Sequence, residues 1–117
     1  MFGTIKANYL IEKAMRRAIQ EVGMNIQNMV DQMPGLVQAQ WRAQLRDLIK
    51  QMKPNEHELS AIICAPYIGA IKNEDTKMGI INKFVDWAEA GLVRPEFIQN
   101  IIDEADVTPE EWHGENL

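Results

Sequence analysis

The stretch AEAGLVRPEF, residues 88–97, decides the fold class, because it joins two apolar segments of helical spacing through one short corner. The first segment ends at Gly91, and the second begins at Pro95. Glycine commonly follows the last residue of a helix, and proline is favoured at the first position of the next one. Such a corner is typical of the helix-turn-helix that reads DNA and equally of a helical bundle, so the chemistry of the second helix distinguishes the two.

The helix that begins at Pro95 lacks the side chains of a DNA-reading helix. Its polar positions are Glu96, Gln99, Asn100, Asp103 and Glu104, with Arg94 as the one cation at its start. A recognition helix needs donors for base edges and cations for phosphates. We therefore interpret residues 88–97 as a corner of a helical bundle, in which Gly91 and Pro95 are structural.

Apolar residues also recur at helical spacing through the first half of the chain. In the first segment they are Ile11, Met15, Ala18, Val22, Ile26, Met29 and Met33, and Pro34-Gly35 ends it. In the second they are Val37, Trp41, Leu45, Leu48 and Met52, and Pro54 ends it. Steps of three and four place each set on one face of a helix. Two such helices joined by Pro-Gly predict an N-terminal αα-hairpin.

Three more helices are expected after Pro54. Asn55 and Glu58 have the spacing of a capping box, which starts a helix that Pro66 must break or bend. Residue 75 or 76 starts the next helix, which ends at Gly91, and Pro95 starts the last. The sequence TPEE, residues 108–111, predicts a short final turn that bears Trp112. No segment alternates as a strand would, so we expect one all-α domain over residues 1–117, a single-domain bundle of about five helices.

Composition and cysteine usage narrow the class of protein further. A chain of 117 residues, 46% hydrophobic and 25% charged, can bury one core, which excludes disordered and fibrous classes. The single cysteine, Cys64, cannot form an intramolecular disulfide, which favours a reducing compartment and a cytoplasmic location. The longest uncharged run, residues 59–71, is shorter than the roughly 20 residues that cross a bilayer. The first residues also lack the order of an export signal, so we expect a soluble protein with no membrane partner.

No catalytic, cofactor or metal motif is found in the sequence. The His-Glu pair at His57 is followed by Ala61 where a zinc-binding second histidine would stand. Two histidines and one cysteine are too few for a structural zinc site, and Cys64 among apolar neighbours is typical of a small buried residue. The acidic residues near 103–106 lack the glycine and the spacing of a calcium loop. We expect a protein that is not an enzyme and that uses no cofactor and no metal.

Charge is distributed unevenly along the chain. Residues 1–53 hold eight basic and four acidic residues, whereas residues 54–117 hold four basic and thirteen acidic ones, which gives net charges of +4 and -9. The basic half carries a stripe on its second helix, Arg42, Arg46, Lys50 and Lys53, beside which Lys13, Arg16 and Arg17 could lie. Such a ridge favours phosphate contacts, although it is equally typical of a solvated helix face. Nucleic-acid binding through the stripe is therefore the alternative function.

The acidic half favours a different function. Its last helix carries Glu96, Asp103, Glu104 and Asp106 as a candidate contact surface for a basic protein partner. Complementary charge speeds encounter and suppresses wrong partners. By elimination of the other classes, we expect a non-catalytic protein-interaction module of the inhibitor, immunity-protein or regulatory-adaptor kind.

The length of the first helical segment raises the question of self-association. An unbroken helix over residues 4–33 would span about 45 Å, whereas a compact domain of this length should be about 35 Å across. Either Gly23 interrupts the helix, or a second copy of the chain covers the excess. We favour the second reading, a homodimer that buries Ile26, Met29 and Met33.

Overall fold

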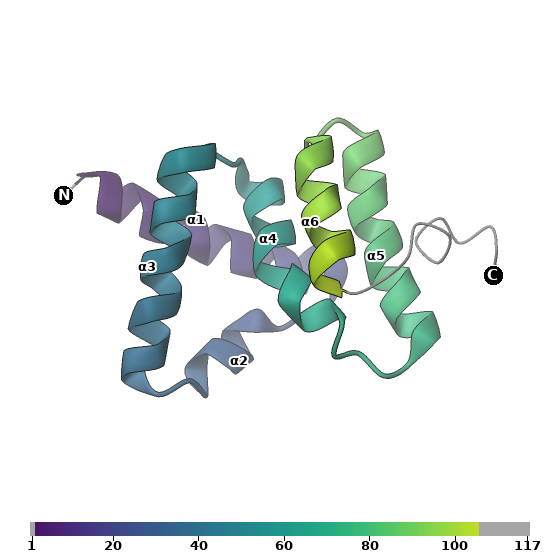
Figure 1. Ribbon diagram of the computed structural model, residues 1–117, viewed down its shortest axis with the longest axis horizontal. Helices are drawn as coiled ribbons and strands as arrows, with labels where there is room; N and C mark the ends of the chain where they lie inside the picture. The colour runs from purple at the N-terminus through teal and green to yellow at the C-terminus, as the bar shows by residue number, and fades with distance from the viewer. Residues whose placement is uncertain (1, 106–117) are drawn as a thin grey trace. The chain divides into compact units, whose positions relative to one another are not determined.

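The computed structural model describes residues 2–105, leaving aside the side chains of Phe2, Asn100, Ile102, Glu104 and Ala105. Every element in this range is a helix, so the all-α class is confirmed (Figure 1). The elements are α1 (Phe2–Arg17), the π-helical turn η1 (Ala18–Val22), α2 (Ile26–Asp31), α3 (Gly35–Met52), α4 (Glu56–Ile68), α5 (Glu74–Glu89) and α6 (Pro95–Ala105). The predicted final turn at residues 108–111, with Trp112, lies outside the described residues.

The chain divides into two compact units, Met1–Ser60 and Ala61–Leu117. The first unit holds α1 to α3 and the start of α4, and the second holds the rest of α4 with α5 and α6. The single domain over residues 1–117 stays a prediction.

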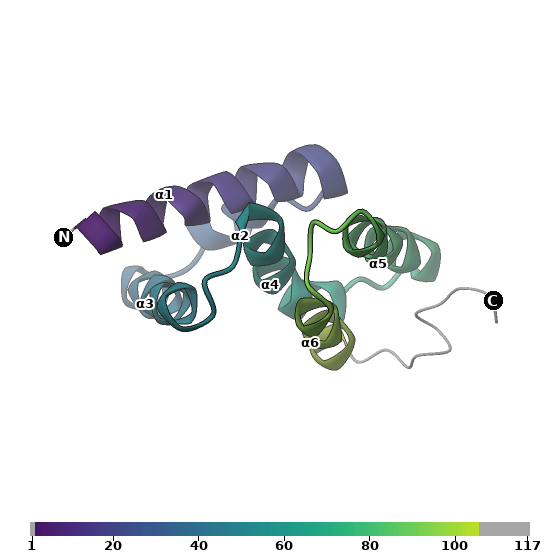
Figure 2. The ribbon, with the colours of Figure 1, turned by 90° about the horizontal axis from the view of Figure 1, so that it is seen from above.

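The first unit is organised by a break at Gly23, where the sequence pattern is continuous. The last turn of the helical rod widens into η1, and the amide of Met24 donates to the carbonyl of Ala18 at 3.1 Å. Gly23 then takes the left-handed conformation, with φ of 80°, which favours glycine because it has no Cβ. Asn25 starts α2 by accepting a hydrogen bond from the Asn28 amide at 3.0 Å. Of the two readings of the first segment, interruption at Gly23 is therefore the one observed (Figure 2).

The core of the first unit comes mainly from α1, η1 and α2. Its buried apolar side chains are Ala7, Ile11, Ala14, Met15, Ala18, Val22, Met24, Ile26, Val30, Leu45 and Leu59. The predicted helix α3 is present, but within it only Leu45 is buried, so most of its apolar face is not enclosed: Val37 is 46% exposed and Trp41 is half-buried. The physical reason is that α3 packs chiefly against α1, and only Leu45 of its apolar stripe is enclosed there.

The start of α4 is tied to this core by hydrogen bonds of two kinds. The predicted capping box is confirmed, because the Glu58 amide donates to Asn55 Oδ1 at 2.8 Å and the Asn55 amide donates to Glu58 Oε1 at 2.9 Å. One turn later the buried hydroxyl of Ser60 donates to the carbonyl of Ala14 in α1 at 2.9 Å. Pro66 lies in the last turn of α4 and does not end the helix at once, since α4 continues to Ile68.

The second unit contains the helical corner expected at residues 88–97. Helices α5 and α6 lie side by side and are joined at Gly91, whose φ is 79° (Figure 1). The Leu92 amide closes the turn by donating to the Trp87 carbonyl at 2.8 Å. Phe84 and Trp87 meet edge to face, with ring centroids 5.1 Å apart, and Phe97 is fully buried. Asn73 rather than a later residue starts α5, because its side chain accepts from the Thr76 amide.

Substitution of two glycines by alanine should change stability in opposite directions. Gly23→Ala should lower the free energy of unfolding by about 1 kcal/mol, because alanine is strained at positive φ even where no atom lies within 4 Å. Gly79→Ala, inside α5 and equally uncrowded, should raise it by roughly 0.5 to 1 kcal/mol. Chemical denaturation followed by circular dichroism measures both. Equal effects of the two substitutions would contradict the assigned backbone conformation at Gly23.

Truncation of two aromatic residues should separate buried from half-buried positions. Phe84 has no exposed surface, so Phe84→Ala should cost about 3 to 5 kcal/mol of unfolding free energy. Trp41 is half-buried on α3, so Trp41→Ala should cost markedly less. The same denaturation measurement applies, and a Trp41 loss as large as the Phe84 loss would show that α3 is buried in solution.

Candidate interaction surfaces

Helix α6 presents two of the four predicted acidic contact residues to solvent. Glu96 and Asp103 are both exposed and stand seven residues apart, which places them on one face of the helix. Asp103 accepts a hydrogen bond from Gln99 at 3.0 Å, and Glu96 lies 3.6 Å from the Arg94 guanidinium. The side chain of Glu104, and Asp106 altogether, lie outside the described residues.

Two further carboxylates lie at the adjoining end of α5, where the sequence analysis did not place a contact. Asp86 and Glu89 occupy the last turn of α5, are exposed, and have no ion-pair partner among residues 2–105. No basic residue stands in that turn. We name Asp86, Glu89 and Glu96 the acidic corner, because α5 ends and α6 begins there. The position of Gly91 in the sequence was the signal that could have found Asp86 and Glu89, since it marks the end of the helix that carries them.

The end of a helix is an unfavourable place for a carboxylate. The aligned peptide dipoles leave a partial negative charge at the carboxyl end, so acidic side chains there are destabilising by about 0.3 to 1 kcal/mol each. The opposite end of α5 has the favourable arrangement, with Glu74 and Asp75 in the first turn. Local electrostatics therefore explains Glu74 and Asp75, but it does not explain Asp86 and Glu89.

Two residues of the predicted basic stripe are engaged in holding α3 to α1. Arg42 forms an ion pair with Glu12 at 3.0 Å, and Arg46 donates to Asn8 Oδ1 over a longer 3.4 Å. Lys50 is exposed, and Lys53 caps α3 in the left-handed conformation with φ of 49°. Since two of the four cations serve the α1–α3 contact, the described residues do not favour the nucleic-acid alternative.

The three cations expected beside the stripe have different environments. Lys13 lies over the ring of Tyr9, 5.1 Å from its centre. Arg17 pairs with Glu21 on η1 and with Glu56 on α4, the second at 3.1 Å. Arg16 is exposed and has no ion-pair or hydrogen-bond partner among the described residues. These three cations therefore have separate environments and do not form the continuous basic ridge predicted beside the stripe.

A shallow pocket of about 510 Å³ lies between the start of α1 and the end of α3. Its charged lining residues are Arg46, Lys50 and Asp47, and Thr4 and Ala7 line it from α1. Charges of both signs meet there, and Arg46 already contacts Asn8. The pocket therefore shows no preference for a ligand of one charge.

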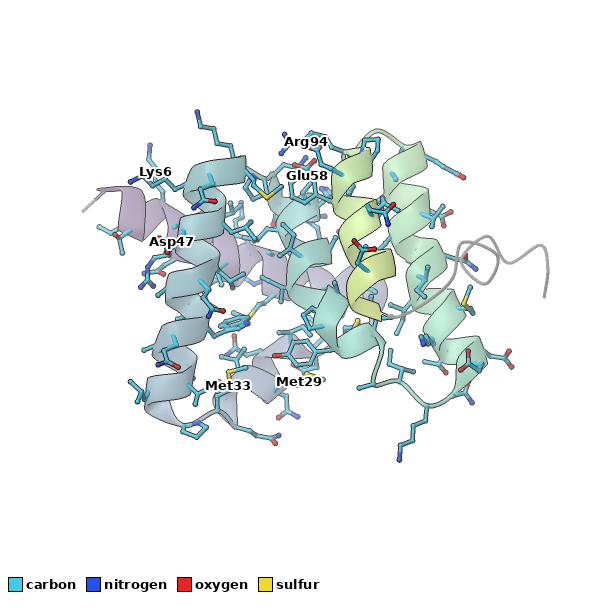
Figure 3. All side chains as sticks on the ribbon, in the orientation of Figure 1. Lys6, Met29, Met33, Asp47, Glu58 and Arg94 are labelled. Atoms are coloured by element: carbon cyan, nitrogen blue, oxygen red, sulfur yellow. The ribbon has the colours of Figure 1, made fainter. Side chains whose placement is uncertain are left out.

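The predicted dimer surface is wrong for one of its three residues. Ile26 is completely buried inside the first unit, because the turn at Gly23 folds α2 back onto the core. Met29, within α2, is 39% exposed, and Met33, just after α2, is half-buried (Figure 3). The break at Gly23 also removes the argument from helix length on which the dimer was predicted.

A charge cluster surrounds His57 at the start of α4. Burial lowers the pKa of His57 below its ordinary value, and the positive charge of Arg17 lowers it further, against the opposing effect of Glu21 and Glu56. Arg17 joins α1 to both carboxylates, although its Nε–H is buried and donates to no partner among the described residues. The cluster therefore holds a neutral histidine next to a structural arginine.

Catalytic and metal chemistry find little support in the part of the chain that is described. Cys64 is fully buried, and burial raises the pKa of its thiol to about 12, so the nucleophilic thiolate is not formed at neutral pH. Within residues 2–105 no three histidine, cysteine, aspartate or glutamate side chains are grouped as a metal site. None of the described helices combines the length and the apolar character that crossing a membrane requires.

No protein-family model, no curated protein and no solved structure matches this chain.

The stability of the fold should depend on the protonation of His57. Because its pKa is lowered in the folded state, the unfolded chain binds the proton more readily once the pH falls below about 6.5. The wild type should therefore lose more unfolding free energy than His57→Gln between pH 7.5 and 5.5, whereas above that range the difference between the two proteins should be constant. Denaturation curves at several pH values measure it. Parallel pH profiles of the two proteins would contradict the lowered pKa of His57.

Proposed function

We propose that this protein is a non-catalytic protein-interaction module, of the inhibitor, immunity-protein or regulatory-adaptor kind, whose acidic corner binds a basic protein partner. The observation that carries the proposal is the position of Asp86 and Glu89 in the last turn of α5, without a compensating cation in that turn. A partner that places lysine or arginine there would pair with both carboxylates and with the negative end of the helix dipole.

The charge of the second unit supports the same kind of partner. Residues 61–117 hold eleven acidic and four basic residues, a net charge of -7. A field of one sign steers an oppositely charged partner and raises the rate of association, while contacts at the rim add less to the affinity. The exposed Glu96 and Asp103 on α6 extend the negative surface beyond the corner.

Two features support a module without catalysis in a reducing compartment. The chain's one thiol, Cys64, is buried and protonated at neutral pH. A fold that is complete without a disulfide needs no oxidising environment, which supports a cytoplasmic location.

Neutralising the corner should strengthen the fold and weaken binding. In the double variant Asp86→Asn, Glu89→Gln we expect the free energy of unfolding to rise by about 0.3 to 1 kcal/mol for each substitution, because two negative charges leave the carboxyl end of α5. The partner should be recovered from an extract of the source cells by wild-type protein but not by the variant, as measured by quantitative mass spectrometry. A loss of binding in a more stable protein cannot be attributed to unfolding.

The matched control is Glu74→Gln, Asp75→Asn, which removes the same charge from the other end of α5. This variant should be less stable than the wild type, because acidic residues are favourable in the first turn, and it should keep the partner. Equal loss of the partner in both variants would show that only the overall charge matters. Retention of the partner by the corner variant would overturn the assignment of the surface.

A further inference from the structure

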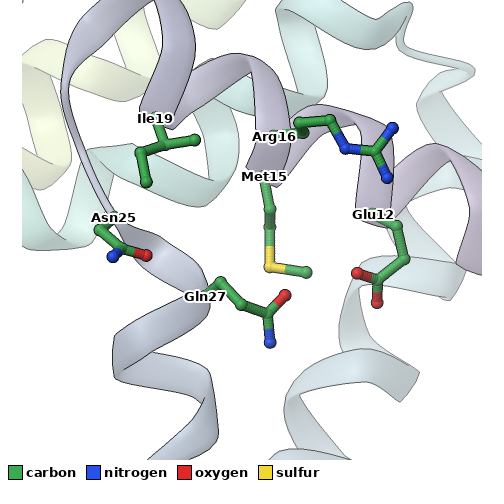
Figure 4. A pocket seen from close by; sticks show the side chains of 6 residues that line it. All are labelled: Glu12, Met15, Arg16, Ile19, Asn25 and Gln27. Carbon is green, nitrogen blue, oxygen red and sulfur yellow. The ribbon is translucent and has the colours of Figure 1, made fainter.

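A small pocket in the first unit lies between the end of the α1–η1 rod and α2 (Figure 4). Its volume is about 200 Å³. Met15 and Ile19 supply an apolar wall, and the Met15 side chain points toward Gln27 on α2. The pocket exists because η1 and Gly23 turn the chain back, which brings Asn25 and Gln27 opposite α1.

The cation at the edge of this pocket is the one arginine of the described chain without a partner. The other arginines pair as follows: Arg17 with Glu21 and Glu56, Arg42 with Glu12, Arg46 with Asn8 and Arg94 with Glu96. Arg16 pairs with none of the residues described. Glu12 also lines the pocket, but its carboxylate is held by Arg42. A carboxylate from outside could therefore approach Arg16 without displacing an existing ion pair.

The size and lining of the pocket select the kind of ligand. Small-molecule sites usually measure about 300 to 1,000 Å³, so about 200 Å³ suits a single side chain of a protein segment. The thioether of Met15 makes favourable contacts with aromatic rings, and a guanidinium binds both carboxylates and the face of an indole. An aromatic residue next to a carboxylate fits all of these groups.

We propose that this pocket binds the segment Glu110–Glu111–Trp112 of a second copy of the chain. Trp112 directly follows two glutamates, whereas Trp41 lies between Gln40 and Arg42, and Trp87 is buried in its own unit. Residues 106–117, which lie outside the described structure, hold four acidic residues and no lysine or arginine. Residues 1–60 hold eight basic and six acidic residues, so the charges of the segment and of the first unit are complementary.

Exchange of this segment gives a closed assembly. Each copy carries one such pocket and one segment, and when two copies exchange their segments reciprocally they form a two-fold dimer in which neither of these pockets is left unfilled. This contact uses none of the residues of the acidic corner, and it does not depend on the proposed basic partner.

A labelled peptide tests the pocket directly. The probe is a synthetic peptide of residues 106–117 with a fluorophore at its amino terminus, and the receptor is the full chain carrying Trp112→Ala, which removes competition from the receptor's own segment. Fluorescence anisotropy should show saturable binding. The further substitution Arg16→Gln in the receptor should weaken it about twofold to fivefold, the range of an exposed charge pair.

The controls separate the pocket from general charge attraction. Lys13→Gln removes the same charge from the same helix at a residue that lies over Tyr9 and does not line the pocket, so it should leave the affinity unchanged. A peptide with Trp112→Ala should bind about thirtyfold more weakly or worse, as expected for a central aromatic anchor. Equal losses for Arg16→Gln and Lys13→Gln, or no binding up to about 1 mM peptide, would overturn the site.

Sedimentation tests the second copy. The wild type should sediment as a dimer at about 100 μM, and Trp112→Ala should shift it to monomer while circular dichroism stays unchanged. The Lys13→Gln variant should remain dimeric. A wild type that is monomeric at this concentration would overturn the exchange between copies.

Discussion

The left-handed turn at Gly23 is the constraint on which the arrangement of the first unit depends. Without it the apolar pattern of residues 11–33 would continue as a single helix, and Ile26 would lie far from Ile11 along one rod. The turn folds the chain back, so that Val22, Met24 and Ile26 are all buried within the same unit. The sequence predicted one helix too long for a single core and a second copy of the chain to cover it. In the structure two shorter elements, α1 with η1 and then α2, pack against each other instead.

The turn also determines which elements the charged residues of α1 can contact. Arg17, at the end of α1, forms ion pairs with Glu21 on η1 and with Glu56 on α4. Glu12, also on α1, forms an ion pair with Arg42 on α3. Solvent-accessible ion pairs contribute about 0 to 1 kcal/mol each, so the Arg42–Glu12 pair positions α3 more than it stabilises it. With Leu45 as the one buried residue of α3, that helix is the least anchored element of its unit. Regions with few buried contacts open most readily, and α3 fits that description.

The features predicted correctly from the sequence are those that depend on neighbours along the chain. The capping box at Asn55 and Glu58, the corner at Gly91 and Pro95, and the burial of Cys64 all follow from local spacing and composition. The break at Gly23 could not be decided in that way, because glycine inside a helix costs only about 1 kcal/mol and leaves the apolar period intact. The exposure of Val37 and the pairing of Arg42 with Glu12 depend on which helix lies opposite, which periodicity does not specify.

The sequence predicted the candidate surfaces from the distribution of charged residues. The structure shows which of these residues stabilise a helix end or form a contact within the described chain, and which do not. Glu74 and Asp75 stabilise the start of α5, Arg17 and Arg42 hold helices together, and Lys13 covers Tyr9. Among the charges without such a role are Asp86 and Glu89 in the last turn of α5, and Arg16 at the edge of a pocket. The two places have opposite charge, so the basic partner proposed for the corner does not suit the pocket. The proposed basic protein at the corner and the proposed acidic, aromatic segment at the pocket would each supply the counter-charge that its place lacks.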